Sequence, residues 1–312
     1  MGMRTSALLI ALLLICCLAF GQNPPQRSIA LTFDDLPMAS NVQPSAAEVT
    51  TNTKAILAAL AKHHAPAIGL VNEAGVHRGD DAERAAALEL WLKGGFELGN
   101  HTYSHPDFNK LTLAEFTADA DKGQVLLKQL LPKYHQPLRF FRYPFNHAGD
   151  TEEKKRGFEK WLAANHYEIA TCTVENSDWV FAAAYDKALE TGDNTSAQKI
   201  RAAYLDLTDA KLAFFEEAST DVFGHEFPQV FLLHANRINA AALDELLTRV
   251  EKRGYRFVTL AEAQSDPVYK TPDNYVGPYG AVWIYRWAST LGKKVDGRKE
   301  PELPHWVEEY AK

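Results

Sequence analysis

Two short stretches carry side chains suited to hydrolysis with a metal ion. Asp34 and Asp35 are adjacent carboxylates at the end of an apolar run, and His101 and His105 stand four residues apart. A divalent metal in a hydrolytic site is typically held by neutral imidazoles and a carboxylate, with one position left open to water. A second carboxylate beside such a site is free to accept a proton from that water. The residue types therefore indicate a metal-assisted hydrolytic site.

Each of these motifs also has a simpler interpretation. Histidines at this spacing share one face of a helical turn, which lets His101 and His105 reach one ion, but such pairs are also common as packed or solvated residues. Adjacent aspartates can cap a helix or form a turn. The apolar surroundings favour the metal site, because a carboxylate at the end of a buried strand is costly without a partner. Arg142, inside another apolar run, is the candidate cation to pair with Asp34 or Asp35.

A further histidine and carboxylate extend the set. His234 follows the apolar run 230–233, and Asp178 precedes Trp179. A single histidine after a strand is often a packed core residue. In this set it is the candidate general acid, with Asp178 as the carboxylate that orients it and Trp179 as an apolar wall.

The elements that must position these residues are strands alternating with helices, which favours parallel strands covered by helices. In barrels of this kind functional residues cluster at the carboxyl ends of the strands. Each candidate residue follows a predicted strand, so all of them are expected to meet at one end of the barrel. The predicted strands are 28–33, 67–71, 96–99, 139–143, 168–174, 230–233 and 256–260, and the predicted helices are 46–63, 80–93, 113–131, 152–165 and 240–253.

The N-terminus predicts export. Residues 1–21 have a basic start, an apolar run and small residues before a cleavage point, as in a secretory signal, and 22–27 form a polar linker. The apolar run is short for a membrane span, so no stable membrane insertion is expected after cleavage. Cys16 and Cys17 leave a lipid anchor open as the alternative. The expected location is therefore the periplasm or the exterior of the cell.

The bulk composition is that of an ordinary globular protein. The chain has 312 residues, of which 46% are hydrophobic, and a net charge of -7. It contains no block of basic residues, which argues against a nucleic-acid partner. After signal cleavage Cys172 is the only cysteine, so no internal disulfide is expected, and its apolar neighbours indicate a packing role. The sequence does not specify an oligomeric state.

The order of the motifs resembles that of the polysaccharide deacetylase family, the NodB homology domain of carbohydrate esterase family 4. The resemblance implies a distorted (β/α) barrel that removes N-acetyl groups from amino sugars. It also implies a divalent metal, in most cases Zn²⁺, with Co²⁺, Ni²⁺ and Mn²⁺ as alternatives. The five matching motifs occupy residues 32–35, 101–105, 142–145, 175–179 and 232–234.

Carried over position by position, the resemblance implies that Asp35, His101 and His105 hold the metal. It implies that Asp34 is the general base, which deprotonates the attacking water, and that His234 is the general acid, which protonates the leaving amine.

The resemblance also implies three supporting residues. Arg142 would hold and polarise Asp34, and the backbone N–H of Phe145 would help to stabilise the oxyanion. Asp178 would position either Arg142 or His234, and the sequence leaves both options open.

The chain departs from the family pattern in three places. Leu36 stands where a glycine is usual, so a narrower mouth of the site is expected. Within the predicted catalytic domain, 28–263, residues 180–228 form a long, mostly helical insertion. Residues 264–312 form an aromatic-rich extension, whose rings are expected to pack onto the barrel, with stacking on sugar rings as the alternative.

The expected function is therefore an exported, metal-dependent deacetylase of N-acetylated glycans, with peptidoglycan or chitin-like oligomers as candidate substrates. Two alternatives remain: the same chemistry on a small non-sugar amide, or a catalytically silent glycan-binding protein. A closed pocket built from Leu36 and 180–228 would favour the small amide, and an open groove would favour glycans. Asp34 and His234 argue against a silent binder, because binding alone requires neither an acid nor a base.

Overall fold

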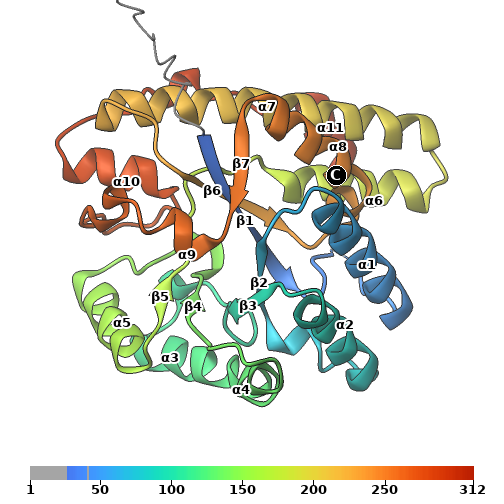
Figure 1. The fold of residues 1–312 in the computed structure, drawn as a ribbon, viewed down its shortest axis with the longest axis horizontal. Coiled ribbons are helices and arrows are strands. Elements are labelled where there is room, and N and C mark those ends of the chain that lie inside the picture. The colour runs from blue at the N-terminus through green and yellow to red at the C-terminus, as the bar shows by residue number, and fades with distance from the viewer. Residues whose placement is uncertain (1–26, 41) are drawn as a thin grey trace, which may run out of the picture.

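A seven-stranded parallel sheet surrounded by helices organises the molecule (Figure 1). The structure, a computed structural model, describes residues 27–40 and 42–312. The predicted signal segment and most of the linker lie outside these residues. The strands are β1 (Arg27–Leu36), β2 (Ala67–Val71), β3 (Glu97–Asn100), β4 (Phe140–Phe141), β5 (Glu168–Ile169), β6 (Gln229–His234) and β7 (Tyr255–Val258).

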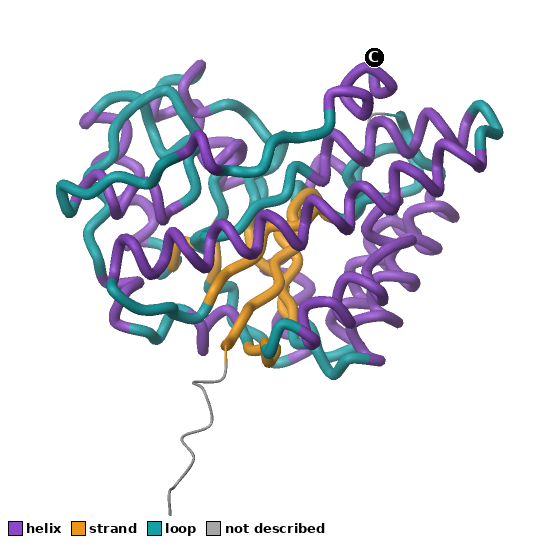
Figure 2. Tube along the Cα trace, turned by 90° about the horizontal axis from the view of Figure 1, so that it is seen from above, coloured by secondary structure: helices purple, strands orange, loops and turns teal. Residues whose placement is uncertain are grey.

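The strand order is β5-β4-β3-β2-β1-β6, and β7 pairs with the first half of β1. Beyond β5 the chain reaches β6, because Val174 forms a parallel bridge with Phe231 and the N–H of Leu232 donates to Val174 O at 2.9 Å. This bridge joins the segment after β5 to β6, and these two strands are the first and last in the strand order. The predicted distorted (β/α) barrel is confirmed. In Figure 2 the strands lie together at the centre, with helices around them.

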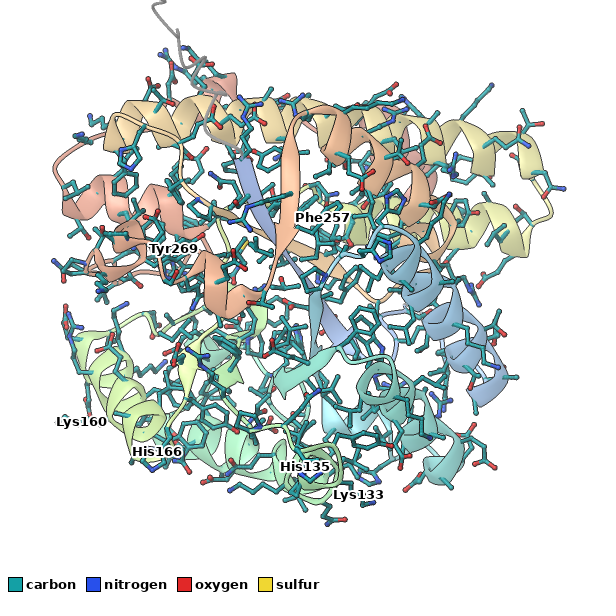
Figure 3. All side chains as sticks on the ribbon, in the orientation of Figure 1. Lys133, His135, Lys160, His166, Phe257 and Tyr269 are labelled. Carbon is teal, nitrogen blue, oxygen red and sulfur yellow. The ribbon has the colours of Figure 1, made fainter. Side chains whose placement is uncertain are left out.

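The helices cover the outside of the sheet, and side chains fill the spaces between the two layers (Figure 3). Four of the five predicted helices are present within a few residues of their expected ends. Among the described residues, no helix has both the length and the apolar composition that a membrane span requires. The helices are α1 (Ala46–Lys62), α2 (Asp81–Lys93), α3 (Leu113–Lys122), α4 (Val125–Leu130), α5 (Glu152–Ala164), α6 (Asp178–Glu190), α7 (Asn194–Phe223), α8 (Arg237–Lys252), α9 (Leu260–Ala263), α10 (Trp283–Thr290) and α11 (His305–Ala311).

The helix predicted over 113–131 is divided into two helices, and the break makes room for the loop that carries His101 and His105. Helix α3 ends at Lys122, and α4 begins at Val125. A Cβ added to Gly123 would lie 2.3 Å from the backbone carbon of Thr102. Gly123 therefore lets the loop that follows β3 press against the end of α3, and a single uninterrupted helix with side chains there would exclude that loop.

Three strands end earlier than predicted: β5 because a side chain replaces its neighbour in the ladder, β4 because its last residues turn into the site, and the strand predicted over 256–260 because Thr259 already caps α9. The prediction extended one strand over 168–174, but β5 ends at Ile169. Gln264 Oε1 accepts the N–H of Thr171 at 2.9 Å, and Gln264 Nε2 donates to Ile169 O at 3.1 Å. The strand predicted over 139–143 is likewise reduced to β4, and its last residues turn into the site.

The insertion and the extension pack against each other. Helix α7 runs along the whole upper edge of Figure 1, with α10 against it, and α11 packs on α6. Trp283 and Trp287 of α10 are buried, as expected for rings that pack the extension onto the barrel. Tyr269, labelled in Figure 3, donates its hydroxyl to Pro228 O at 2.6 Å. Residues 264–312 thus form an integral layer of the fold.

Candidate active site

Three side chains form a cluster with the composition of a metal site. The ligand atoms of Asp35, His101 and His105 all lie within 4.8 Å of one another. Each histidine Nε2 lies 3.5 Å from Asp35 Oδ1. That carboxylate oxygen is buried and has no hydrogen-bond partner, which is costly unless a cation binds it. Two imidazoles and a carboxylate fit a divalent cation such as Zn²⁺.

The tautomer of His101 supports the same interpretation. Its Nδ1 donates to Arg142 O at 2.8 Å, which leaves the Nε2 lone pair directed at the cluster. Burial, followed by the charge of His105, lowers the pKa of His101 to about 3. The imidazole is therefore neutral at physiological pH, as a metal ligand must be.

The histidine pair is not on a helix, so the helical-turn argument for its geometry was wrong. Residues 101–105 form an irregular loop, in which Thr102 and His105 have φ values of 71° and 57°. Asp119 of α3 holds this loop, since its carboxylate accepts the N–H groups of Tyr103 and Ser104 at 2.9 and 3.0 Å. The two imidazole rings meet edge to face, with centroids 5.0 Å apart.

Asp34 lies beside the cluster and is paired with a buried arginine. Arg142 is fully buried, and its Nη1 donates to both Asp34 oxygens at 3.3 and 3.2 Å. The same guanidinium is fixed by Thr32 Oγ1 at 3.0 Å and by Ala170 O at 2.6 Å. A rigid positive charge therefore orients Asp34, whose Oδ2 lies 3.7 Å from Nε2 of His101.

His234 lies next to Asp34, because the two are register partners on β6 and β1. Its Nδ1 donates to Asp178 Oδ1 at 2.6 Å, and its backbone N–H donates to Asp178 Oδ2 at 2.8 Å. Burial lowers the pKa of His234, but the Asp178 charge and hydrogen bond outweigh burial and raise the pKa to about 10. Of the two partners that the sequence left open for Asp178, the structure gives His234.

Asp178 is itself buried, and its carboxylate accepts several hydrogen bonds from the protein. Besides His234, it accepts hydrogen bonds from the side-chain amides of Asn239 at 2.6 Å and Asn236 at 3.2 Å. Burial alone would raise the pKa of Asp178, but His234 and these donors hold the pKa below its usual value. The Asp178–His234 pair is therefore ionised on both sides, and it leaves His234 Nε2 free.

Phe145 lines the same cavity as the two histidines and contacts His105. Its backbone is left-handed, with φ 56°, and its ring lies 4.5 Å from the ring of His105. The extension presses against this residue: a Cβ on Gly280 would lie 1.8 Å from Phe145 O. The position of the Phe145 backbone therefore depends on residues far away in the sequence.

A cavity of about 850 Å³ opens over these residues. Tyr275, Tyr279, Tyr285 and Glu300 of the extension form one wall. The sequence left stacking of these rings on sugars open as the alternative to packing, whereas the place of Glu300 was not predicted. The lining residues are Asp34, Asp35, His101, His105, Tyr143, Phe145, Asn146, Glu175, Trp179, Leu232, His234, Tyr275, Tyr279, Gly280, Ala281, Val282, Tyr285 and Glu300.

The expectation that Leu36 narrows the mouth of the site was wrong. Leu36 is fully buried, lies outside the cavity lining and packs on Gly69, where an added Cβ would lie 2.3 Å from its side chain. Its side chain therefore fills the core and does not narrow the mouth. The insertion 180–228 contributes no lining residue either, because α7 packs behind the cavity wall.

Comparison with known proteins agrees with the motif order. The family model of polysaccharide deacetylases matches residues 21–158. A chitin deacetylase of Arthroderma benhamiae is 25% identical over 240 residues, which are 77% of this chain and 52% of the relative. A peptidoglycan-N-acetylglucosamine deacetylase of Bacillus cereus is 25% identical over 249 residues, 78% of this chain and 70% of the relative. The chain thus spans about half the length of the chitin deacetylase.

Solved structures agree in fold. A CE4 family pseudoenzyme from Bacillus anthracis has a TM-score of 0.51 at 18% identity, over 77% of this chain and 66% of that one. A polysaccharide deacetylase from Bacillus cereus has a TM-score of 0.50 at 18% identity, over 75% and 91%. The family model and both relatives thus show similarity to polysaccharide deacetylases, which are hydrolases that act on carbon–nitrogen bonds other than peptide bonds.

Proposed function

We propose that this chain is a metal-dependent deacetylase that hydrolyses the N-acetyl amide of amino-sugar glycans to a free amine and acetate. One observation carries the proposal: the buried Asp34–Arg142 pair and the Asp178–His234 pair both adjoin the Asp35 cluster in one cavity. The names of the two relatives, a chitin deacetylase and a peptidoglycan deacetylase, support the substrate class.

Asp35, His101 and His105 are the ligands for the cation. A divalent cation held there would polarise the acetyl carbonyl and lower the pKa of a water molecule. Zn²⁺ suits two imidazoles and one carboxylate best, and Co²⁺, Ni²⁺ and Mn²⁺ accept the same donors.

Proton transfer falls to the two residues beside the cluster. Asp34, oriented by Arg142, accepts a proton from the attacking water. The backbone N–H of Phe145 donates to the oxyanion that forms at the acetyl carbon. His234, held as imidazolium by Asp178, donates its Nε2 proton to the leaving nitrogen as the carbon–nitrogen bond breaks. The O–H group of the water adds to the acetyl carbon, and the acetic acid that forms loses its proton to solvent as acetate. The proton that Asp34 accepts replaces the one that His234 donates, so atoms and charge balance.

The cavity lining favours a glycan over a small amide. A closed pocket for a small amide was expected to need Leu36 and 180–228, and neither lines the cavity. A silent binder would have no use for a buried, oriented base and acid together. Export belongs to the same proposal, because residues 1–21 have the pattern of a secretory signal, with a lipid anchor at Cys16 or Cys17 as the alternative.

The test is acetate release by the purified chain, loaded with metal or treated with chelator, from N-acetylglucosamine oligomers and from peptidoglycan. Release that chelator abolishes and metal restores is the expected result. Asp34→Asn serves as the inactive reference. No release from any glycan by metal-loaded protein would overturn the proposal.

A further inference from the structure

We propose that the C-terminal extension, 264–312, forms a sugar-binding subsite that selects neutral or amine-bearing glycans over glycans that carry carboxylates. The inference rests on the proposed function and defines its substrate class more closely. Three observations lead to it: the extension is fixed to the reaction centre, it adds an exposed aromatic ring to the cavity, and it adds a carboxylate there.

The extension is clamped to the loop that carries Phe145. Arg286 of α10 is buried, and its guanidinium donates to the backbone oxygens of Ala281, at 2.7 Å, and Asn146. Asp273 accepts from Arg286 at 3.2 Å and from Lys155 of α5 at 2.7 Å. In Figure 1 helix α10 of the extension lies between α5 and α7. The wall that the extension forms is therefore a fixed part of the site.

Three aromatic rings at the cavity are exposed to an unusual degree. Tyr279, Trp179 and Phe145 have 73%, 63% and 53% of their surface accessible, and they come from three separate segments. Large exposed rings that share one cavity mark a binding surface. The C–H faces of a pyranose ring can pack against them, while the hydroxyl groups at the ring edge stay free for hydrogen bonds.

Two carboxylates supply acceptors at the same cavity. Glu300 Oε1 accepts from Lys211 at 2.5 Å, and its Oε2 accepts from the Tyr285 hydroxyl at 2.5 Å. Glu175 accepts from Lys211 at 3.1 Å and from the N–H of Ser177 at 3.0 Å. Each carboxylate is thus held in place, and each oxygen retains a lone pair for a hydroxyl or ammonium group of a ligand.

An independent feature also indicates a polar ligand. Asn146 lines the cavity and is only 9% exposed, yet its side-chain oxygen has no hydrogen-bond partner among the described residues. A buried amide oxygen without a partner is costly, so a donor group on a ligand would relieve that cost.

The charge of the lining sets the substrate class. The residues that line the cavity include four carboxylates and the protonated His234 and, over the described part of the chain, no lysine or arginine. Asp34 and Asp35 serve the reaction centre, whereas Glu175 and Glu300 share a single ammonium group, that of Lys211. An added carboxylate on the ligand would be repelled there, and a hydroxyl or ammonium group would be accepted. Chitin-type oligomers meet this condition, while lactyl and peptide carboxylates of peptidoglycan do not.

The experiment compares four variants of the full chain with wild type. Tyr279→Ala and Glu300→Gln alter the subsite, and Trp306→Ala and Glu302→Gln are matched controls in the same extension that do not line the cavity. The substrates are tetra-N-acetylchitotetraose and a disaccharide of N-acetylglucosamine and N-acetylmuramic acid, with its lactyl carboxylate either free or converted to an amide. The readouts are kcat and KM for acetate release, and Tm.

For the chitin oligomer, Tyr279→Ala is expected to raise KM by roughly three- to tenfold with kcat retained. Wild type is expected to prefer the amidated disaccharide to the free acid, and Glu300→Gln is expected to reduce that preference by roughly threefold. The wild-type comparison of the two disaccharides needs no variant, so it stands even if Glu300→Gln fails to fold. If wild type is active but Tyr279→Ala matches Trp306→Ala and the free acid is preferred, the subsite proposal is overturned and the proposed function stands. If metal-loaded wild type releases acetate from no glycan, the proposed function itself fails.

Discussion

Nδ1 of His234 lies 2.6 Å from Oδ1 of Asp178, a buried carboxylate that is not part of the cavity lining. Asp178 affects the imidazole of His234 in two ways. Asp178 holds the imidazole in one orientation, and its charge keeps the ring protonated. His234 is therefore protonated before a substrate binds, as its proposed role of general acid requires.

The first prediction is that Asp178→Asn moves the alkaline limb of the pH profile to lower pH. Burial lowers the pKa of His234 and Asp178 raises it to about 10, so removal of the charge lets burial dominate. The imidazolium is then lost at a lower pH, and kcat/KM at neutral pH falls by about 10²-fold. Glu190→Gln, on the same helix but exposed, is the control. The measurement is kcat/KM against pH, and an unshifted alkaline limb would contradict the role of Asp178.

The second prediction concerns the base. Asp34→Asn keeps the shape of the side chain but cannot accept the proton of water, so kcat is expected to fall by about 10³-fold. Metal content is expected to remain at the wild-type level, because Asp34 is not among the three clustered ligands. Acetate release and metal analysis on one preparation check both parts. Wild-type-like activity would refute the assignment of Asp34 as base.

The third prediction concerns the ligands and needs no activity assay. A cation that binds only the folded chain raises Tm, so Zn²⁺ is expected to stabilise the wild type against heat. His101→Ala is expected to lose both the bound metal and this metal-dependent rise in Tm. His147→Ala, a histidine outside the cluster, is expected to retain both. An unchanged metal content in His101→Ala would show that the cluster is not the metal site.

The sequence predicted the positions of most strands and helices, because these depend on local patterns of apolar and polar residues. It predicted the wrong geometry for His101 and His105, since their loop is set by distant residues. Asp119 holds that loop through hydrogen bonds, and Gly123 makes room for it. A spacing of four fits a helix, but it does not reveal which distant carboxylate receives the backbone N–H groups.

The same limit explains the other corrections. Leu36 was expected to narrow the mouth of the site because it stands where the family pattern has a glycine. Its actual neighbour, Gly69 on the adjacent strand, becomes apparent only once the strands are paired. Tyr279 and Glu300 were not distinguished from the tryptophans that pack α10, because all of them belong to one aromatic-rich segment. Which side of the extension meets the cavity is decided by its contacts with α5 and α7, which the sequence pattern does not contain.

The fourth prediction tests whether the extension positions the reaction centre. A Cβ on Gly280 would lie 1.8 Å from Phe145 O, so Gly280→Ala must displace either the extension or the Phe145 backbone. Since misplacement by about 1 Å can cost 10²-fold in rate, kcat is expected to fall by about tenfold or more. Gly297→Ala is the matched control, because a Cβ there would meet its nearest neighbour at an ordinary 3.5 Å. Stopped acetate assays and thermal melts of both variants make the comparison. Equal kcat values in the two would mean that the extension and the Phe145 loop act independently.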